Sequence, residues 1–342
     1  MRSSAGPDFS AFSQPAANGR FMPPAPAIPS VSVLIPTYNA GAWLLPAVRS
    51  ALHQVDIEKE VIVCDDGSTD DSLQQIGAAE FARVTVIRTA HRGGNAARNA
   101  LLAAAHGEWV QFLDADDYLE DGKIARQFAE AGAIDDVDVL YSPVWEETWI
   151  DGRATHRFAS PLDTSADLFT QWIRWQLPQT GGTLWRRAAL QRLGGWNEAI
   201  PCCQEHELYL RALQAGLRWK FCPSVGAVYR IWSENTVCRR DPLRVIRQRT
   251  ALIDQALAWL DDRQLRRPGH THAAAQACFE MARTWARHDL AGATAYFRDR
   301  RRHALARVRG PAAPLGYRAA LALGGFAFAE KIAARQRPVA AP

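Results

Sequence analysis

A chain of 342 residues with 48% hydrophobic content can bury a core as one large or two modest domains. The net charge of +4 conceals an asymmetry, since residues 1–238 carry 20 basic and 28 acidic side chains, and residues 239–342 carry 20 and 8. The acidic part suits metal binding and the basic part suits anionic partners. A membrane span is excluded, because no run approaches the roughly 18 apolar residues that it needs. The nearest, residues 319–329, predicts a buried helix, with a membrane contact as the alternative.

Cysteine usage and the N-terminal composition bear on the compartment. The six cysteines show no C-x-x-C spacing, and the adjacent Cys202 and Cys203 cannot readily bridge each other. We therefore expect a reduced, cytoplasmic protein rather than a disulfide scaffold. Residues 1–29 are rich in Ala, Pro, Ser and Gly and lack the apolar core of a signal peptide, so we expect a disordered leader.

The first half of the chain alternates apolar runs with helical periodicity. Strands are predicted at 31–36, 61–64, 84–87 and 108–113. Helices are predicted between them at 43–52, 70–79 and 95–105, from apolar residues at helical spacing. This alternation predicts an α/β fold with a doubly wound, mostly parallel sheet.

Beyond residue 117 the pattern is mixed and then purely helical. Strands are predicted at 137–142, 144–150, 219–222 and 225–231, and helices at 121–131, 165–175, 186–192 and 204–215. From residue 243 only helical periodicity remains, at 243–260, 273–288, 293–308 and 315–334. These patterns divide the chain into an α/β domain over 30–240, an all-helical C-terminal region over 241–337 and a tail over 338–342.

Polar residues follow three of the predicted strands: Thr37 and Asn39 follow the first, and acids follow the other two. The strand ending at Leu113 runs into Asp114, Asp116 and Asp117, and the strand ending at Cys64 runs into Asp65-Asp66. In a parallel sheet such strand ends line one crevice, where clustered carboxylates need a cation or a donor-rich ligand. A divalent metal carrying a diphosphate meets this need, which predicts a nucleotide-sugar site. The Asp-x-Asp pair alone is weak, since about one arises by chance in a chain this rich in Asp, and the pair at 136–138 is expected to be structural.

Five segments in order resemble the inverting glycosyltransferase family 2, which has the GT-A nucleotide-sugar-binding fold. They are IPTYN at 35–39, DDGSTDDS at 65–72, GGNAARN at 93–99, GEWVQFLDADD at 107–117 and GGWNEAIPCCQEHELYLRALQAG at 194–216. The matches span residues 31 to about 235, so the resemblance covers the first two thirds of the chain and leaves the helical region unassigned.

The resemblance implies a set of donor-binding residues: Pro36, Thr37, Tyr38, Asn39, Asp66, Arg98, Asp114 and Trp196. In this reading Tyr38 packs on the nucleobase, Asp66 accepts a hydrogen bond from it, and Asp114 holds the ribose. Trp196 would wall the donor or acceptor sugar. Loop packing for Tyr38, and a solvated face or an ion pair with Asp65 or Asp66 for Arg98, remain alternatives.

The metal and the base are implied in the same way. Asp116, with Asp117 sharing the role, is expected to hold Mg²⁺ or Mn²⁺ through carboxylate oxygens. Glu205 falls on the position of the catalytic base, although a helix N-terminus also favours an acid there. Trp232 stands where many relatives carry a metal-binding His, and an indole N–H cannot ligate a cation. That departure weakens the expectation of tight metal binding.

Together, these features predict an enzyme that moves a sugar from a nucleotide donor to a glycan or lipid-linked acceptor. The donor is expected to be UDP-linked. A non-catalytic sugar-nucleotide-binding scaffold and a sugar-nucleotidyltransferase are the alternatives. Six arginines between 298 and 309 suit solvated helix faces or an anionic membrane surface at the inner face of the membrane, while nucleic acid is not expected as a partner.

Overall fold

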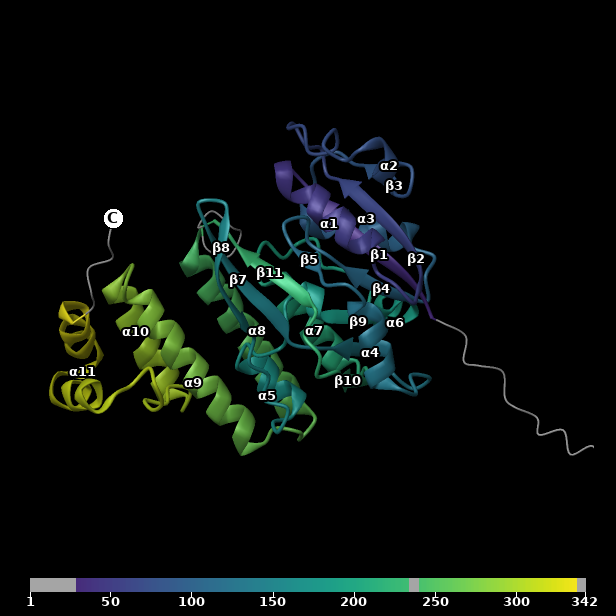
Figure 1. The fold of residues 1–342 in the computed structure, drawn as a ribbon. Coiled ribbons are helices and arrows are strands. Elements are labelled where there is room, and N and C mark those ends of the chain that lie inside the picture. Colours follow the sequence, from purple (N-terminus) through teal and green to yellow (C-terminus); the bar gives the residue numbers. More distant parts are fainter. Residues whose placement is uncertain (1–28, 234–239, 337–342) are drawn as a thin grey trace, which may run out of the picture.

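The computed structural model describes residues 29–233 and 240–336. The part of the chain before residue 233 contains two β-sheets with helices packed around them. The four C-terminal helices lie together at one side of this part (Figure 1). The expected leader, apart from residue 29, and the expected tail lie outside the described residues. Within those residues, no helix has the length and apolarity needed to cross a membrane.

The larger sheet has seven strands in the order β10-β6-β9-β4-β1-β2-β3. Neighbouring strands in this sheet are parallel, except that β9 is antiparallel to both β4 and β6. The strands are β1 (Ser30–Thr37), β2 (Glu58–Asp65), β3 (Thr85–Arg88), β4 (Trp109–Phe112), β6 (Val139–Tyr141), β9 (Thr183–Arg186) and β10 (Trp219–Phe221). The prediction of a mostly parallel α/β sheet is therefore confirmed.

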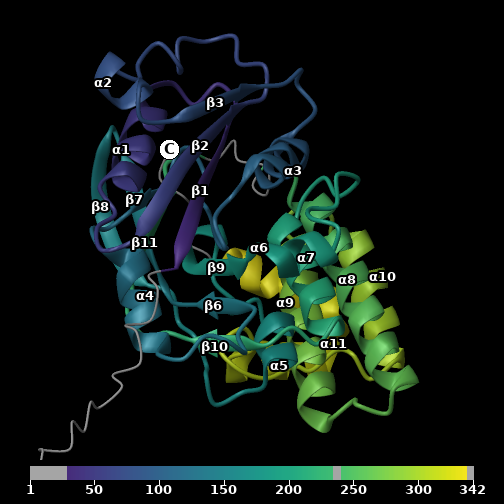
Figure 2. The ribbon, with the colours of Figure 1, turned by 90° about the vertical axis from the view of Figure 1, so that its right-hand side faces the viewer.

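Both faces of this sheet are covered, as continuous apolar strands require. Val33 and Ile35 of β1 point into a core shared with helix α1 (Leu44–Leu52), which follows the short 3₁₀ helix η1 (Gly41–Trp43). Leu34 points the other way, into a core shared with helix α3 (Gly94–Ala104). Figure 2 shows α1 and α3 on opposite sides of β1 and β2. The alternation along one strand thus fixes which helix lies on which face.

Strand register brings the polar strand ends to one edge. Thr37 at the end of β1 pairs with Asp65 at the end of β2, and Leu34 pairs with Phe112 of β4, two residues before Asp114. Parallel neighbours that end at one level deliver their following residues to the same crevice. The sheet therefore brings the predicted site together.

The predicted helix over 70–79 is wrong. Residues 70–76 form turns, and only a single helical turn, α2 (Ala78–Phe81), follows. The Asp70 carboxylate accepts the backbone N–H groups of Ser72 and of Gly41, at 3.1 and 3.0 Å. Short polar side chains that satisfy the backbone in this way compete with helix formation.

A second sheet, in the order β5-β11-β7-β8, was not foreseen as a separate layer. Its strands are β5 (Tyr118–Leu119), β11 (Ala227–Ile231), β7 (Val144–Ile150) and β8 (Arg153–Ala159). Every residue of β8 is exposed, so no buried face produces the alternation that marks a strand. β8 pairs with β7 across a turn at Asp151 and Gly152, both in the left-handed region.

The remaining elements are helical. They are α4 (Lys123–Ala131), α5 (Leu168–Ile173), η2 (Thr180–Gly182), α6 (Arg187–Arg192), α7 (Gln204–Gln214), α8 (Pro242–Asp262), α9 (Pro268–Trp285), α10 (Leu290–Arg302) and α11 (Leu315–Arg335). Residues of α8 and α9, such as Ile253 and Ala274, belong to the core that also holds Leu34 of β1. α10 and α11 pack around a separate core at Phe297 and Phe326, to which α9 contributes Phe279. The first two C-terminal helices therefore pack as part of the sheet domain.

Candidate functional site

A cavity of about 670 Å³ lies at the carboxyl ends of β1, β2 and β4. Eight predicted site residues line it: Pro36, Thr37, Tyr38, Asn39, Asp66, Arg98, Asp114 and Asp116. They come from segments up to 80 residues apart, which the parallel register brings together. A volume of this size is ordinary for a small-molecule site.

An aromatic pair forms one wall of this cavity. Tyr38 is 46% exposed and stacks on His91, with ring centroids 3.9 Å apart and planes 22° apart. The buried Thr37 hydroxyl has no hydrogen-bond partner among the described residues, although Thr37 lines the same cavity. A flat aromatic wall beside an unsatisfied hydroxyl suits a planar polar ring such as a nucleobase. His91 lies outside the five motif segments, so the sequence did not single it out.

Asp66 is buried and already holds several donors from its own chain. Its carboxylate accepts the backbone N–H groups of Arg92 and Gly93, at 3.0 and 2.7 Å, and the Thr89 hydroxyl at 3.0 Å. The His91 Nδ1 lies 3.2 Å from the same carboxylate. Because a carboxylate offers about four acceptor sites, Asp66 anchors the 89–93 loop, and its expected bond to a nucleobase stays a prediction.

The 89–93 loop leads into the N-terminus of α3. Gly93 has φ = +97°, a conformation that side chains with a Cβ rarely adopt, and both Gly93 and Gly94 line the cavity. Arg92 crosses the opening to Glu198, with Nη2 and Oε2 2.8 Å apart. The unsatisfied N–H groups and the dipole of an eleven-residue helix favour a negatively charged group here.

Arg98 extends from α3 to the acidic strand end. Its Nη2 lies 2.6 Å from Asp114 Oδ1, and its guanidinium stacks 4.7 Å over the ring of Trp196. Burial opposes the charge, yet Asp114, Glu205 and Asp116 together raise the pKa of Arg98. The ion-pair alternative therefore holds, but with Asp114 rather than Asp65 or Asp66.

Trp196 is 3% exposed, and its ring packs against the guanidinium of Arg98. Its ring also meets Phe112 edge-on at 5.2 Å, and it lines neither the donor cavity nor the neighbouring cavity that holds Glu205. Its backbone N–H donates to Asn99 Oδ1 at 2.8 Å. In this structure Trp196 reaches the site through Arg98, and its expected contact with a sugar stays a prediction.

Asp116 and Asp117 point in different directions. Trp232 Nε1 donates to Asp116 Oδ2 at 2.9 Å, and Asp116 lines the cavity. Asp117 is 4% exposed, and its Oδ1 accepts the backbone N–H of Arg230 at 2.8 Å, which ties the site to β11. Burial, and then the charge of Asp114, raises the pKa of Asp116, while burial and both neighbouring acids raise that of Asp117. Asp116 is therefore the better placed of the two for a ligand.

The acidic cluster fits a cation that a ligand helps to hold. Among residues 29–233 and 240–336, no group of three or more His, Cys, Asp or Glu side chains is arranged around a metal position. Asp116 keeps one carboxylate oxygen free of the Trp232 bond, and burial, followed by the charge of Asp114, raises its pKa in spite of the nearby Arg230. Mg²⁺ and Mn²⁺ are commonly held by one or two carboxylates plus phosphates and water. The residues thus fit a metal ion that binds together with a diphosphate. Within the described parts of the chain, they do not form a site in which protein side chains alone surround the ion.

A second cavity, of about 380 Å³, adjoins the first, and both are lined by Arg98, Asp114, Asp116 and Gln204. Glu205, at the start of α7, lines this second cavity and accepts the Thr180 hydroxyl at 3.0 Å. Glu207 instead pairs with Arg211 through both carboxylate oxygens, at 2.8 and 2.9 Å. The geometry therefore leaves Glu205, and not Glu207, available to a ligand.

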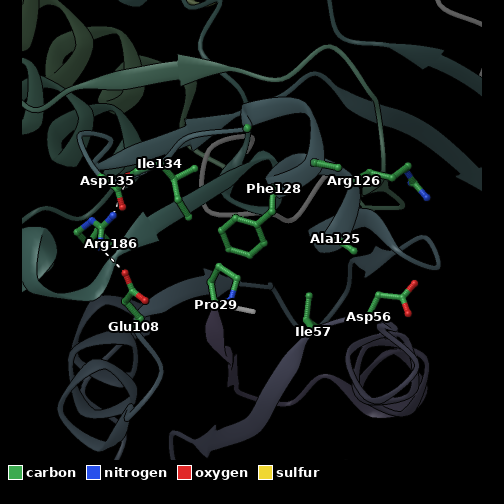
Figure 3. A pocket seen from close by; sticks show the side chains of 12 residues that line it. Pro29, Asp56, Ile57, Glu108, Ala125, Arg126, Phe128, Ile134, Asp135 and Arg186 are labelled. Atoms are coloured by element: carbon green, nitrogen blue, oxygen red, sulfur yellow. Dashed lines mark hydrogen bonds and ion pairs between the residues drawn. The ribbon is translucent and has the colours of Figure 1, made fainter. Parts of the chain in front are cut away.

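A larger cavity, of about 820 Å³, lies elsewhere, and Figure 3 shows Phe128 and Pro29 facing each other across it. Its charged residues include Arg186 and Glu108, which are bonded to each other (Figure 3). None of the predicted site residues lines it. Its position at the amino end of β1 separates it from the strand ends that carry the acids.

Comparison with known proteins agrees with this site. The family model described as "Glycosyl transferase family 2" matches residues 32–194. The Escherichia coli protein WfaP, a UDP-Glc:alpha-D-GlcNAc-diphosphoundecaprenol beta-1,3-glucosyltransferase, is 30% identical over 206 residues, which are 59% of this chain and 77% of WfaP. This chain belongs to glycosyl transferase family 2. The matched region includes every predicted donor residue except Trp196, and it ends before Glu205.

Two further proteins are similar to this chain over a comparable region. The succinoglycan biosynthesis protein ExoU of Rhizobium meliloti is 32% identical over 210 residues, 57% of this chain and 60% of ExoU. Chondroitin synthase of Escherichia coli is 40% identical over 191 residues, 55% of this chain and 27% of that protein. The chain thus spans about 60% of the length of ExoU and of ExoO.

Solved structures show the same fold. The Pyrobaculum calidifontis mannosyltransferase PcManGT, solved with GDP-Man and Mn²⁺, has a TM-score of 0.54 at 18% identity and covers 90% of this chain and 88% of its own. TarS 1–349 of S. aureus, solved with UDP-GlcNAc, has a TM-score of 0.53 at 20% identity, with 81% of this chain and 90% of its own covered. The family's GT-A-type fold is therefore confirmed for this chain.

Proposed function

We propose that this protein is an inverting glycosyltransferase that moves a sugar from a UDP-linked donor to a glycan or lipid-linked acceptor. One observation carries the proposal: two cavities meet at Arg98, Asp114 and Asp116. The first cavity holds the candidate nucleotide contacts, and the second holds the candidate base Glu205. A group-transfer enzyme needs this arrangement, because donor and acceptor must meet at one point with a base beside the acceptor.

The donor cavity supplies binding and charge neutralisation. Tyr38 and His91 stack against the base, Asp114 holds the ribose, and Arg92 and the N-terminus of α3 face the diphosphate. Arg98 stays charged throughout, because Asp114 and its other acidic neighbours raise its pKa. It thereby stabilises the negative charge that grows on the leaving nucleoside diphosphate.

The acceptor cavity supplies the base. Glu205 takes the proton from an acceptor hydroxyl as the hydroxyl oxygen attacks the anomeric carbon. In this proposal the acceptor occupies the second cavity and the diphosphate the first. Displacement with the hydroxyl attacking opposite the leaving diphosphate inverts the configuration of the anomeric carbon. Thr180, whose hydroxyl donates to Glu205, holds the carboxylate in place.

A divalent cation would complete the donor cavity. Bound with the diphosphate, Mg²⁺ or Mn²⁺ supplies positive charge to the leaving group. Asp116 is the residue proposed to hold it, with Trp232 orienting the carboxylate through its indole N–H. Asp117 positions this strand end through its bond to the Arg230 backbone.

Two other functions fit the structure less well. A sugar-nucleotidyltransferase would be expected to carry a Gly-rich, Lys-bearing loop after the first strand, and Pro36 to Asn39 differ from it. A non-catalytic binding protein would have no use for Glu205 held in the second cavity, next to Gln204, which lines both cavities. Catalysed breakdown of a nucleotide sugar separates the enzyme from both alternatives.

The expected donor can be tested by thermal stability. UDP-glucose, UDP-GlcNAc, UDP and GDP-mannose are each added with Mn²⁺ and with EDTA. Binding to the native state raises the melting temperature by mass action, so a UDP compound with Mn²⁺ should give the largest rise. A larger rise with GDP-mannose would overturn the choice of base, and no rise with any nucleotide would overturn the donor site.

The C-terminal helices offer a surface that suits a lipid-linked acceptor. Arg298, Arg301 and Arg302 of α10 border a groove beside the kink of α11, where Gly325 has φ = +76°. Leu323, next to this kink, is 85% exposed. We propose that this surface docks on an anionic membrane, since each basic side chain contributes about 1 kcal/mol near such a surface.

Docking predicts salt-sensitive binding to vesicles. The protein should co-sediment with phosphatidylserine-containing liposomes at low salt and separate from them at high salt, because the attraction is screened. The triple variant Arg298→Gln, Arg301→Gln, Arg302→Gln should lose most of this binding. A variant with three exposed arginines outside this surface replaced (Arg83, Arg153 and Arg263) serves as the matched control. Equal sedimentation of both variants, or none for the wild type, would rule out this surface.

A further inference from the structure

An arginine lies in the second cavity without an acidic partner. Arg249, on α8, lines this cavity together with Glu205. Its Nη2 donates to the backbone carbonyl of Ile173 at 3.2 Å, and its buried Nε has no hydrogen-bond partner among the described residues. No carboxylate in residues 29–233 or 240–336 forms an ion pair with it. Arg98, in the same cavity, has Asp114 for that purpose.

A stack of rings holds this guanidinium in place. Arg249 lies 4.6 Å over the ring of Trp175, which stacks on His206 at 3.4 Å, and His206 stacks in turn on Trp172 at 4.7 Å. The four residues come from α5, the segment after it, α7 and α8, so the stack joins the sheet domain to the helical region. Such a stack fixes an arginine before any ligand arrives.

The backbone at Trp175 is strained to build this stack. Trp175 has φ = +65°, which costs free energy for a bulky residue and is rare outside glycine. Cys203, the residue just before α7, also has a positive φ, of 59°. It lies two residues before Glu205. Strain of this kind is usually retained at binding or catalytic sites. Here it occurs on two segments that line the same cavity.

The charge of Arg249 is a further argument for a ligand in this cavity. Burial lowers the pKa of Arg249, and the acid that opposes this effect most, Glu280 on α9, acts through space without an ion pair. His206 brings no negative charge to Arg249, and burial, followed by the nearby Arg249, lowers the pKa of His206 well below the ordinary range. A half-buried cation whose Nε is buried and unpaired is costly unless a ligand brings the opposite charge.

We propose that Arg249 forms an anion subsite for the acceptor, so that the accepted glycan carries a carboxylate or phosphate group close to the hydroxyl that reacts. This rests on the proposed function, because it takes the second cavity to be the acceptor site. The cavity volume of about 380 Å³ suits one sugar unit with its anionic group. Arginine binds both kinds of oxyanion through paired N–H donors, so the experiment must separate the two sources.

The test measures binding, and it does not depend on turnover. Full-length protein is saturated with UDP and Mn²⁺ to fill the first cavity. It is then titrated with methyl β-glucuronide, glucose 1-phosphate or methyl β-glucoside, with ligand-observed NMR as the readout. We expect at least one anionic probe to bind about tenfold more tightly than the neutral glucoside, and the preference to weaken with salt. The tighter of the two anionic probes identifies carboxylate or phosphate as the source.

Two variants make the result specific. Arg249→Gln should abolish the preference for the anionic probe, and Arg249→Lys, which keeps the charge but not the fork, should retain part of it. Arg247→Gln is the matched control, since Arg247 is exposed on the same helix, stacks over Trp285 and lines neither cavity. Melting temperatures of all variants report the structural role of the stack separately.

The outcomes separate this inference from the proposed function. UDP binding together with equal affinity for charged and neutral probes, or a preference that survives Arg249→Gln, would overturn the anion subsite alone. An Arg249-dependent preference in a protein that binds no nucleotide would support the subsite and overturn the donor assignment instead.

Discussion

Replacing Glu205 by Gln should lower turnover by roughly 10²- to 10⁴-fold, because the substitution keeps the size of the side chain and removes the base. Affinity for the nucleotide donor should stay the same, since Glu205 lines only the second cavity. Steady-state release of UDP from a UDP-sugar, together with calorimetric titration of UDP, gives both quantities.

Glu207→Gln is the control for this variant. Glu207 lies on the same helix, two residues further on, but both of its carboxylate oxygens bind Arg211, which also donates to the backbone carbonyls of Leu193 and Gly195. Its replacement should lower thermal stability, because a partly buried ion pair loses one partner. Turnover at a temperature where the variant is folded should change little. Loss of turnover in Glu207→Gln with activity retained in Glu205→Gln would reverse the assignment.

Replacing Asp116 by Asn should remove the part of donor binding that depends on metal. The amide can still accept the indole N–H of Trp232, but it loses the charge that would bind Mg²⁺ or Mn²⁺. We expect the Mn²⁺-dependent increase in UDP-sugar affinity to fall by a factor of about 10 or more, on the scale of an interaction with a charged group. Titrations with Mn²⁺ and with EDTA measure the difference.

Asp117→Asn provides the contrast. Asp117 accepts a backbone N–H from β11, a bond that the amide oxygen of Asn can also accept, so this substitution should leave the response to metal almost unchanged. If Asp117→Asn abolishes the Mn²⁺ response while Asp116→Asn preserves it, the two acids have been assigned the wrong way round.

The sequence was informative where chemistry follows buried strands. β1, β2 and β4 carry apolar runs that end in polar residues, so the crevice at their ends could be predicted from the pattern alone. Trp232 was foreseen as a departure from the family, but not that its indole would donate to Asp116. That contact crosses 116 residues and depends on β11 pairing beside β5.

The sequence was uninformative where contacts are made by exposed or distant residues. β8 has no buried face, and the turn over 70–76 is decided by side chains that bind the backbone, so neither leaves a periodic signal. His91 and Arg249 lie outside the matched motifs, and each enters a cavity only through the packing of other elements. Arg249 in particular depends on α8 packing against α7, which periodicity cannot place.

The most direct test of the central claim is the configuration of the sugar that the enzyme first releases. UDP-glucose or UDP-GlcNAc, both α-linked, is incubated with the enzyme and Mn²⁺ with water as the acceptor, and the anomeric proton is followed by NMR before mutarotation mixes the forms. Direct displacement with Glu205 as base predicts that the β-anomer appears first and that its rate falls in Glu205→Gln. Initial release of the α-anomer, at a rate that Glu205→Gln leaves unchanged, would contradict the account.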